Sequence, residues 1–341
     1  MVSSTRRCSV VLFAIAGAML GACRPTPVTA DPVSPTHALA VTPVEVPDGA
    51  AKMPTADGSA ARCDASHSAA LRSFPDDATV LAGVNIAAVI QAPAFGPFLA
   101  VDIPMDLRSA LAAATQCGLG RDTWRSVTFA STLSSSNTGF ALRADGAGSL
   151  DKLECVRARM KADSGKDPFT LATTPSGIEL AFDDGSRGWV VDPCTVVIAS
   201  KQWIAPVRAR MQGVGTAAVE GRLASATARA DQRKHAWLAI VTDPVLMGSM
   251  VPGAQDLAVS VEVTSRVSLT ASLAFAEPSA AAKQSAELER QVSSMKSLFV
   301  SIGAPQSIAD RIKIGPAGSF VMISADADER ELAQIAKLMA N

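Results

Sequence analysis

Residues 257–275 indicate the fold class of this chain, with the sequence LAVSVEVTSRVSLTASLAF. Apolar side chains occupy every second position on both sides of a break between Val263 and Val267. Strict alternation over two adjoining segments predicts an antiparallel hairpin with one buried face. The stretch that begins near Pro278 then carries apolar residues at intervals of three and four, which predicts a helix. A hairpin followed by a helix is the unit from which the rest of the chain is interpreted.

The first half of the chain beyond residue 67 shows a similar order of elements. It predicts a strand, a helix, a hairpin, a helix, a second hairpin and a short helix, over residues 79–86, 107–117, 124–142, 150–160, 178–198 and 204–211. We therefore predict an α+β fold, in which helices pack on one face of an antiparallel sheet. An internal duplication of a strand-helix-hairpin-helix unit divides it into residues 68–213 and 214–341. This order also allows one continuous sheet shared by both halves.

The N-terminus has the pattern of an export signal. Arg6 and Arg7 precede an apolar run of 13 residues, 8–20. A membrane-spanning helix needs about 20 apolar residues, so this run is too short to span. A basic start, a short apolar core and small residues after it are typical of a secretory signal peptide, here residues 1–22.

The end of the run, Leu20-Gly21-Ala22-Cys23, resembles the lipobox of bacterial lipoproteins. That resemblance implies diacylglycerol on Cys23, cleavage before it, and acylation of the new amino group by a fatty acid such as palmitate. Arg24 stands where an aspartate would retain enteric-type lipoproteins in the inner membrane, so the resemblance favours the outer membrane. Cleavage after Ala30 is the alternative, and it would release a soluble secreted protein.

Residues 23–67 are interpreted as a lipidated cysteine followed by a tether. Seven prolines without periodicity stiffen it toward polyproline II: Pro25, Pro27, Pro32, Pro35, Pro43, Pro47 and Pro54. Such a segment would hold a folded body away from a lipid surface. His37 and His67 fall in this stretch and are expected to be solvated.

Four cysteines remain after Cys23, namely Cys63, Cys117, Cys155 and Cys194. An even number in an exported chain predicts two disulfides, for which three pairings exist. A bridge between two predicted helices, Cys117 to Cys155, is preferred, and it leaves Cys63 with Cys194. No spacing typical of a zinc site occurs, so no metal is expected.

The composition excludes several classes of function. The formal net charge of −1 argues against a nucleic-acid binder, and the absence of tyrosine argues against a platform for stacking bases or sugars. Gly118-Leu119-Gly120 and Gly213-Val214-Gly215 lack the strand and third glycine of a dinucleotide site. We read the second as a junction between halves, and we expect no cofactor.

A few acidic and aromatic groups are weak candidates for chemistry. Asp183-Asp184 could act as paired carboxylates, although a hairpin turn explains them better. Asp326, Asp328 and Glu329 could bind calcium, although the start of a capped helix explains them better. His235 lies beside a strand and is interpreted as a partly exposed edge residue. Core packing is the preferred interpretation of the tryptophans over an apolar pocket: Trp124, Trp189, Trp203 and Trp237.

The sequence therefore favours a non-enzymatic binding or interaction module. It would be anchored by lipid in the bacterial envelope, facing the periplasm or the cell surface. The alternatives are a carrier for a lipid or other apolar ligand and an envelope hydrolase that uses carboxylates. The membrane, an envelope protein or an apolar ligand are the expected partners, and nucleic acid is not. The chain as a whole also resembles two-repeat lipoproteins of high-GC bacteria, a resemblance that implies no activity.

Overall fold

The structure is a computed structural model. It describes residues 62–94, 105–133, 137–175, 177–241, 251–301 and 305–340. The signal peptide, Cys23 and most of the tether, with His37, lie outside these residues. Within the described ranges, no helix combines the length and apolar character needed to cross a membrane.

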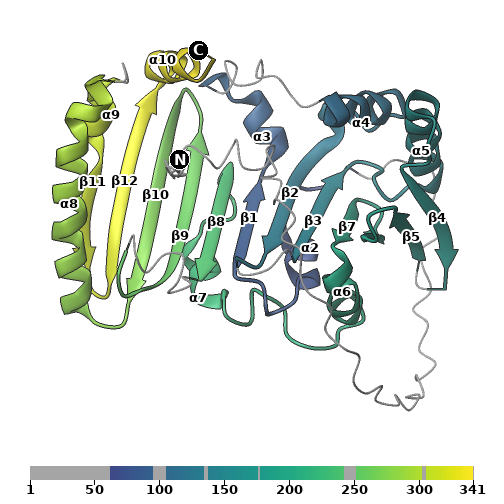
Figure 1. Cartoon of the computed structure of the whole chain (residues 1–341), viewed down its shortest axis with the longest axis horizontal. Helices are drawn as coiled ribbons and strands as arrows, with labels where there is room; N and C mark the ends of the chain where they lie inside the picture. Colours follow the sequence, from purple (N-terminus) through teal and green to yellow (C-terminus); the bar gives the residue numbers. More distant parts are fainter. Residues whose placement is uncertain are drawn as a thin grey trace, which may run out of the picture. The chain divides into compact units, whose positions relative to one another are not determined.

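A twelve-stranded sheet, in which every neighbouring pair is antiparallel, forms the body of the protein (Figure 1). Its order is β11-β12-β10-β9-β8-β1-β2-β3-β7-β6-β5-β4. The strands are β1 (Val80–Val84), β2 (Trp124–Ser131), β3 (Thr138–Ala144), β4 (Phe169–Thr174), β5 (Gly177–Phe182), β6 (Arg187–Asp192), β7 (Thr195–Ala199), β8 (Ala236–Val241), β9 (Ala254–Val263), β10 (Arg266–Phe275), β11 (Lys313–Ala317) and β12 (Phe320–Asp328). The predicted antiparallel α+β sheet is confirmed, and the alternating stretch that predicted it forms most of β9 and β10.

The pairing order repeats on the two sides of the sheet's centre. In the first half the neighbours run β1-β2-β3-β7-β6, and in the second half they run β8-β9-β10-β12-β11. In both, a strand is followed by a hairpin, and a later strand returns to pair with the hairpin's second strand. The hairpin of β4 and β5 extends the first half only. The two series meet where β1 pairs with β8, so one sheet runs through both halves.

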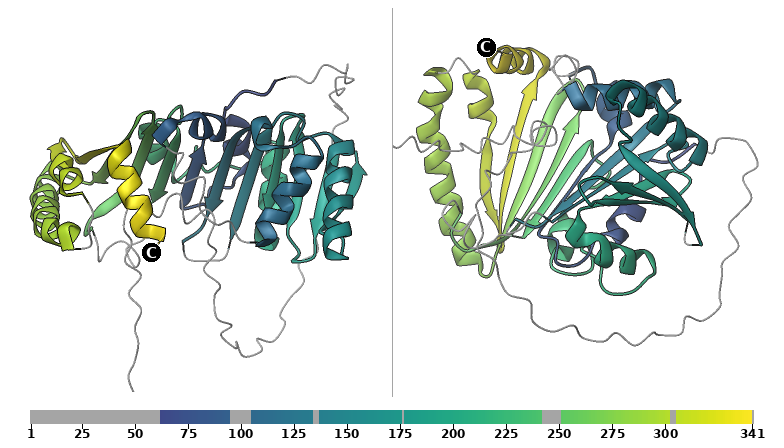
Figure 2. Two further views of the ribbon diagram at one scale, coloured as in Figure 1. Left: turned by 90° about the horizontal axis from the view of Figure 1, so that it is seen from above. Right: turned by 45° about the vertical axis from the view of Figure 1, so that its right-hand side comes forward.

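Helices pack on both faces of this sheet. They are α2 (Ser68–Ser73), α3 (Ile86–Gln91), α4 (Met105–Gln116), α5 (Leu150–Ser164), α6 (Ile204–Met211), α7 (Ala224–Arg229), α8 (Pro278–Ser301), α9 (Gln306–Arg311) and α10 (Glu329–Ala340), with single 3-10 turns at Arg121–Thr123 and Lys201–Trp203. Figure 2 shows α8 beside the β11 end of the sheet.

The strand register assigns each helix cluster to a face. We call the pairing of β1 with β8, where the two halves meet, the seam. Leu81 and Ala239 pair across it and point to one face, where they share a core with α2, α6 and α7. Val263 and Ala327 point to the other face, where they pack with α9 and α10. α5 and α8 pack on that second face as well. The prediction that all helices lie on one face is therefore wrong in that detail. Strands at the centre of the sheet carry apolar side chains on both faces, so helices cover both.

Core packing confirms the interpretation of the tryptophans. Trp189, Trp203 and Trp237 are almost completely buried, and Trp124 is partly buried against a core cluster. Trp237 lies over Gly83 of the neighbouring strand, which leaves room for the indole because it has no side chain.

The two disulfides have the preferred pairing. Cys117 follows α4 and joins Cys155 of α5, with 5.7 Å between their Cα atoms. Cys63 joins Cys194 in the turn between β6 and β7, with a Cα–Cα distance of 5.9 Å. Disulfides of this kind form and persist in oxidising compartments, so they indicate a location outside the cytoplasm.

We predict that Gly83→Ala destabilises the protein by about 1–3 kcal/mol, because the added methyl would overlap the Trp237 indole in a packed core. Urea unfolding followed by tryptophan fluorescence measures the change. Gly315→Ala in β11 is the matched control, since its Cβ would have no neighbour within 4 Å. Equal stabilities for the two variants would contradict this account of the seam.

Candidate functional site

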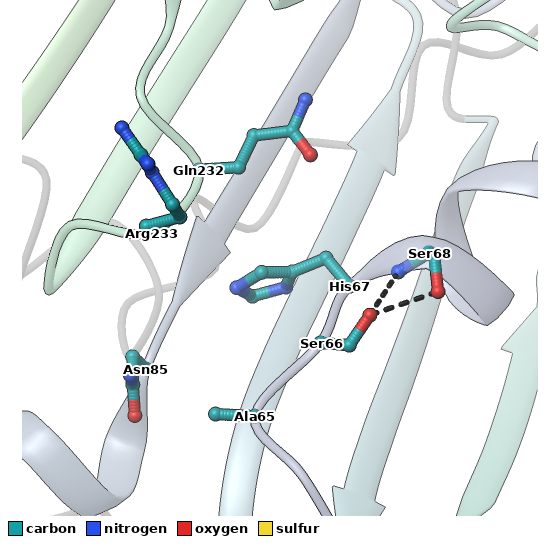
Figure 3. A pocket seen from close by; sticks show the side chains of 7 residues that line it. All are labelled: Ala65, Ser66, His67, Ser68, Asn85, Gln232 and Arg233. Carbon is teal, nitrogen blue, oxygen red and sulfur yellow. Dashed lines mark hydrogen bonds between the residues drawn. The ribbon is translucent and has the colours of Figure 1, made fainter.

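A hollow of about 420 Å³ lies where the chain enters the sheet, at one end of β1 and β8 (Figure 3). It is lined by Ala65, Ser66, His67, Ser68, Asn85, Gln232 and Arg233. Three separate parts of the chain supply this wall. They are the segment before α2, the residue after β1 and the turn before β8. The hollow therefore lies at the seam between the two halves.

Residues 62–67 lie against the sheet and are fixed at several points. Besides the disulfide of Cys63, the Cys63 amide donates to Asp145 Oδ1 at 2.8 Å. The Arg143 guanidinium binds the Asp64 carboxylate at 2.9 Å, and it also donates to Thr195 Oγ1 at 2.7 Å. These contacts position His67, three residues after Asp64, over the centre of the sheet.

His67 is the last buried side chain of this segment, after Cys63. It is 4% exposed, and its Nδ1 lies 2.8 Å from Thr128 Oγ1 on β2. Its ring meets the Trp237 indole edge to face, with 5.5 Å between ring centroids. Nε2 is buried and has no hydrogen-bond partner among the described residues. The expectation that His67 is solvated is wrong, because the disulfide and Arg143 hold its segment against the sheet.

The environment keeps the His67 imidazole neutral. Burial lowers its pKa from the usual 6.5 to about 4, because the charged form loses its hydration. The cations of the turn before β8 are already paired: Arg233 with Asp231 of the same turn at 3.0 Å, and Lys234 with Glu262 of β9 at 2.6 Å. The hollow therefore presents hydrogen-bonding groups without an unbalanced charge.

The remaining wall is built by local hydrogen bonds. Asn85 caps α3, since its Oδ1 accepts from the Ala88 amide at 3.2 Å. The Ser66 and Ser68 hydroxyls lie 2.8 Å apart and bond to each other. In Figure 3 the His67 ring points from its segment toward the side where Gln232, Arg233 and Asn85 lie. Such a wall suits a small polar molecule that can bond to amide, hydroxyl and imidazole groups.

The carboxylates singled out in the sequence do not meet here. Asp183 and Asp184 form the turn between β5 and β6, as expected. Asp184 accepts hydrogen bonds from the Ser186 amide at 2.9 Å and from its hydroxyl, and the hydroxyl bond comes first among the causes that lower its pKa. This arrangement has the contacts of a turn residue rather than those of an acid–base pair.

The acids near residue 328 also have structural contacts. Asp328 and Glu331 form a capping box at the start of α10, because each side chain accepts from the other's amide, at 2.8 and 3.0 Å. Asp326 binds Arg266 at 2.9 Å, and Glu329 opens α10. No group of three or more metal-ligating side chains occurs within the described ranges.

The other residues singled out in the sequence lie in ordinary positions. His235 is partly exposed, as expected, and burial is the first cause that lowers its pKa. Gly118 follows α4, and Gly213 and Gly215 follow α6, all three with positive φ. Cys23 lies outside the described residues. The hollow itself was not predicted, because the turn with Gln232 and Arg233 lies more than a hundred residues beyond the rest of the wall and no local motif marks it.

Comparisons with known proteins find a likeness in the fold. No family model matches the chain, and no curated protein matches it. Among solved structures, it is similar to crystal form III of TP0453, a Treponema protein. The TM-score is 0.48 at 12% identity, over 78% of this chain and 97% of that one. Form I gives 0.46 at 11% over 79% and 96%, and form IV gives 0.47 at 10% over 81% and 100%. These values describe a similar fold and give no information about function.

We predict that acid destabilises the protein by about 3 kcal/mol through His67, because protonation places a charge in its buried site. In the unfolded chain His67 binds a proton near pH 6.5, whereas in the folded protein it does so only near pH 4. The destabilisation is therefore absent above pH 6.5 and grows as the pH falls toward 4.

Urea unfolding at pH 7 and pH 4.5 measures this loss in the wild type and in His67→Gln. Carboxylates contribute to the acid response of both proteins, so the difference between the two isolates His67. The variant should lose less stability over this interval. An NMR titration of His67 with a midpoint near 6.5 would contradict the prediction.

Proposed function

We propose that this chain is a lipid-anchored protein of the bacterial cell envelope, and that its folded unit is a non-enzymatic binding module. The lipobox-like residues 20–23 support the anchor, and Arg24 supports sorting to the outer membrane. The two disulfides agree with an envelope location.

The observation that carries the proposal is the attachment of residues 62–67 to the sheet. A disulfide, an ion pair and a buried histidine hold this short segment, at the place where the proline-rich stretch ends. Such attachment suits a folded unit that hangs from a tether, because it defines the point at which the chain leaves the body.

The hollow at the seam is the proposed place of binding. His67 Nε2 is buried at its wall without a partner among the described residues, and an unpaired buried polar atom is costly. A ligand hydroxyl, amide or carboxylate could supply the missing hydrogen bond. A small polar ligand fits this wall better than a lipid. The turn position of Asp183 and Asp184 gives a carboxylate-based hydrolase no support.

We predict that Cys23→Ser abolishes lipid labelling, because the thioether needs the Cys23 thiol. The full chain is expressed in a bacterial host fed an alkyne-tagged fatty acid, and label on the protein is measured. Cys8→Ser is the matched control, since Cys8 lies inside the apolar run and should leave labelling unchanged. Label that persists in Cys23→Ser would contradict the anchor.

We predict that the full chain, purified in detergent from an oxidising periplasm, carries a small exchangeable molecule in native mass spectrometry. Gln232→Trp should remove the added mass by filling the hollow. Gln291→Trp, on an exposed part of α8, should retain it. A wild-type chain of bare mass, or equal added mass in both variants, would overturn the proposed binding site but not the anchor.

A further inference from the structure

The sheet is open, and its two ends are built differently. β11 forms one edge and β4 forms the other (Figure 1). An edge strand exposes backbone N–H and C=O groups that can pair with another strand, and proteins commonly block such edges with proline, charge or a covering helix. The register of each hairpin determines which residues present these groups.

The β11 edge is blocked. Ala317 pairs with Phe320 across a two-residue turn, so Ala317, Gly315 and Lys313 bond to β12 while Ile314 and Pro316 face outward. Pro316 has no N–H to donate, which interrupts the row of outward donors. α8 also packs against this strand, as both views of Figure 2 show.

The β4 edge is less protected. Pro168 and Pro175 flank the strand, and α5 packs on one face of it, but no proline interrupts the strand itself. Thr174 pairs with Gly177 across the turn, and the Phe182 amide of β5 points away from β4 and donates to the Ser186 carbonyl. This alternation directs the backbone groups of Phe169, Leu171 and Thr173 away from β5, toward the open edge. These groups have no hydrogen-bond partner among the described residues, and the strand, FTLATT, contains neither proline nor charge. Three donors and three acceptors are therefore available at the spacing that a further antiparallel strand requires.

We propose that this edge pairs with the β4 edge of a second copy of the chain. A twofold axis at Leu171 would place Leu171 against its own copy, Phe169 against Thr173, and Thr170 against Ala172. About six backbone hydrogen bonds would form. Because β4 is uncharged, this self-pairing brings no like charges together. Asp167, just before the strand, is neutralised by Lys161 at 2.7 Å and would not meet its own copy.

The difference between the edges also limits the assembly to two copies. Pairing of β4 with β11 would build an open filament, because the contact is heterologous and can repeat. Pro316 and α8 oppose that contact. Pairing of β4 with β4 is isologous, so it closes with two copies and leaves only the blocked β11 edges outside. This inference goes beyond the proposed function and does not depend on an anchor at Cys23.

Sedimentation equilibrium of the full chain in density-matched detergent tests the proposal. The wild type should show twice the chain mass at high concentration. Thr173→Pro removes an outward N–H without touching a bond to β5, and it should raise the dimer dissociation constant about tenfold or more. Thr173→Val keeps the N–H and should match the wild type. Circular dichroism checks that each variant is folded.

A charge pair tests the register of the contact. Thr170 and Ala172 are exposed and would face each other across the twofold axis. Thr170→Lys with Ala172→Lys should therefore weaken the dimer, and Thr170→Lys with Ala172→Glu should restore it. A wild-type chain that stays monomeric overturns the self-pairing, even if the edge binds a strand of another protein. A dimer that Thr173→Pro leaves unchanged overturns it as well.

Discussion

The antiparallel pair of β1 and β8 is the contact on which the rest of the structure depends. Five residues of β1 pair with β8, from Val80 with Ile240 to Val84 with Ala236. Leu81 and Ala239 are fully buried there, and Gly83 accommodates Trp237 from the other half. Without this pair each half would expose a strand edge, and the core cluster that holds Leu81 together with Trp237 and Ala239 would be divided. The pair of β1 and β8 therefore joins two similar series of strands into one continuous sheet.

The candidate site follows from the same seam. β1 ends at Asn85, and the turn with Gln232 and Arg233 leads into β8, so two walls of the hollow are strand ends that the seam brings together. The third wall, with His67, is held there by the disulfide of Cys63 and by Trp237 beneath the ring. The polar hollow and the apolar core are thus built on the same strand pair, and a change in one is expected to disturb the other.

Sequence patterns predicted the parts of the fold that have strong local periodicity. The alternation of residues 257–275 predicted β9 and β10, and the positions of the cysteines favoured the two observed bridges. β4 and β11 were missed, because each is a short edge strand in which threonine, glycine or proline replaces alternation. The helices on the second face were missed, because the central strands carry apolar side chains on both faces of the sheet. His67 was misjudged because its burial comes from Thr128 and Trp237, which lie far along the chain.

The long stretch of chain between β1 and β8 delays their pairing during synthesis. β1 ends at Val84 and its partner begins at Ala236, so about 150 residues must be made before the pair can close. At the usual speed of synthesis this takes on the order of 10 s. During that interval the first half has an incomplete core, since Trp237 has not yet been made. A chain that stays open while it is being made is suited to crossing a membrane unfolded and closing its seam on the far side.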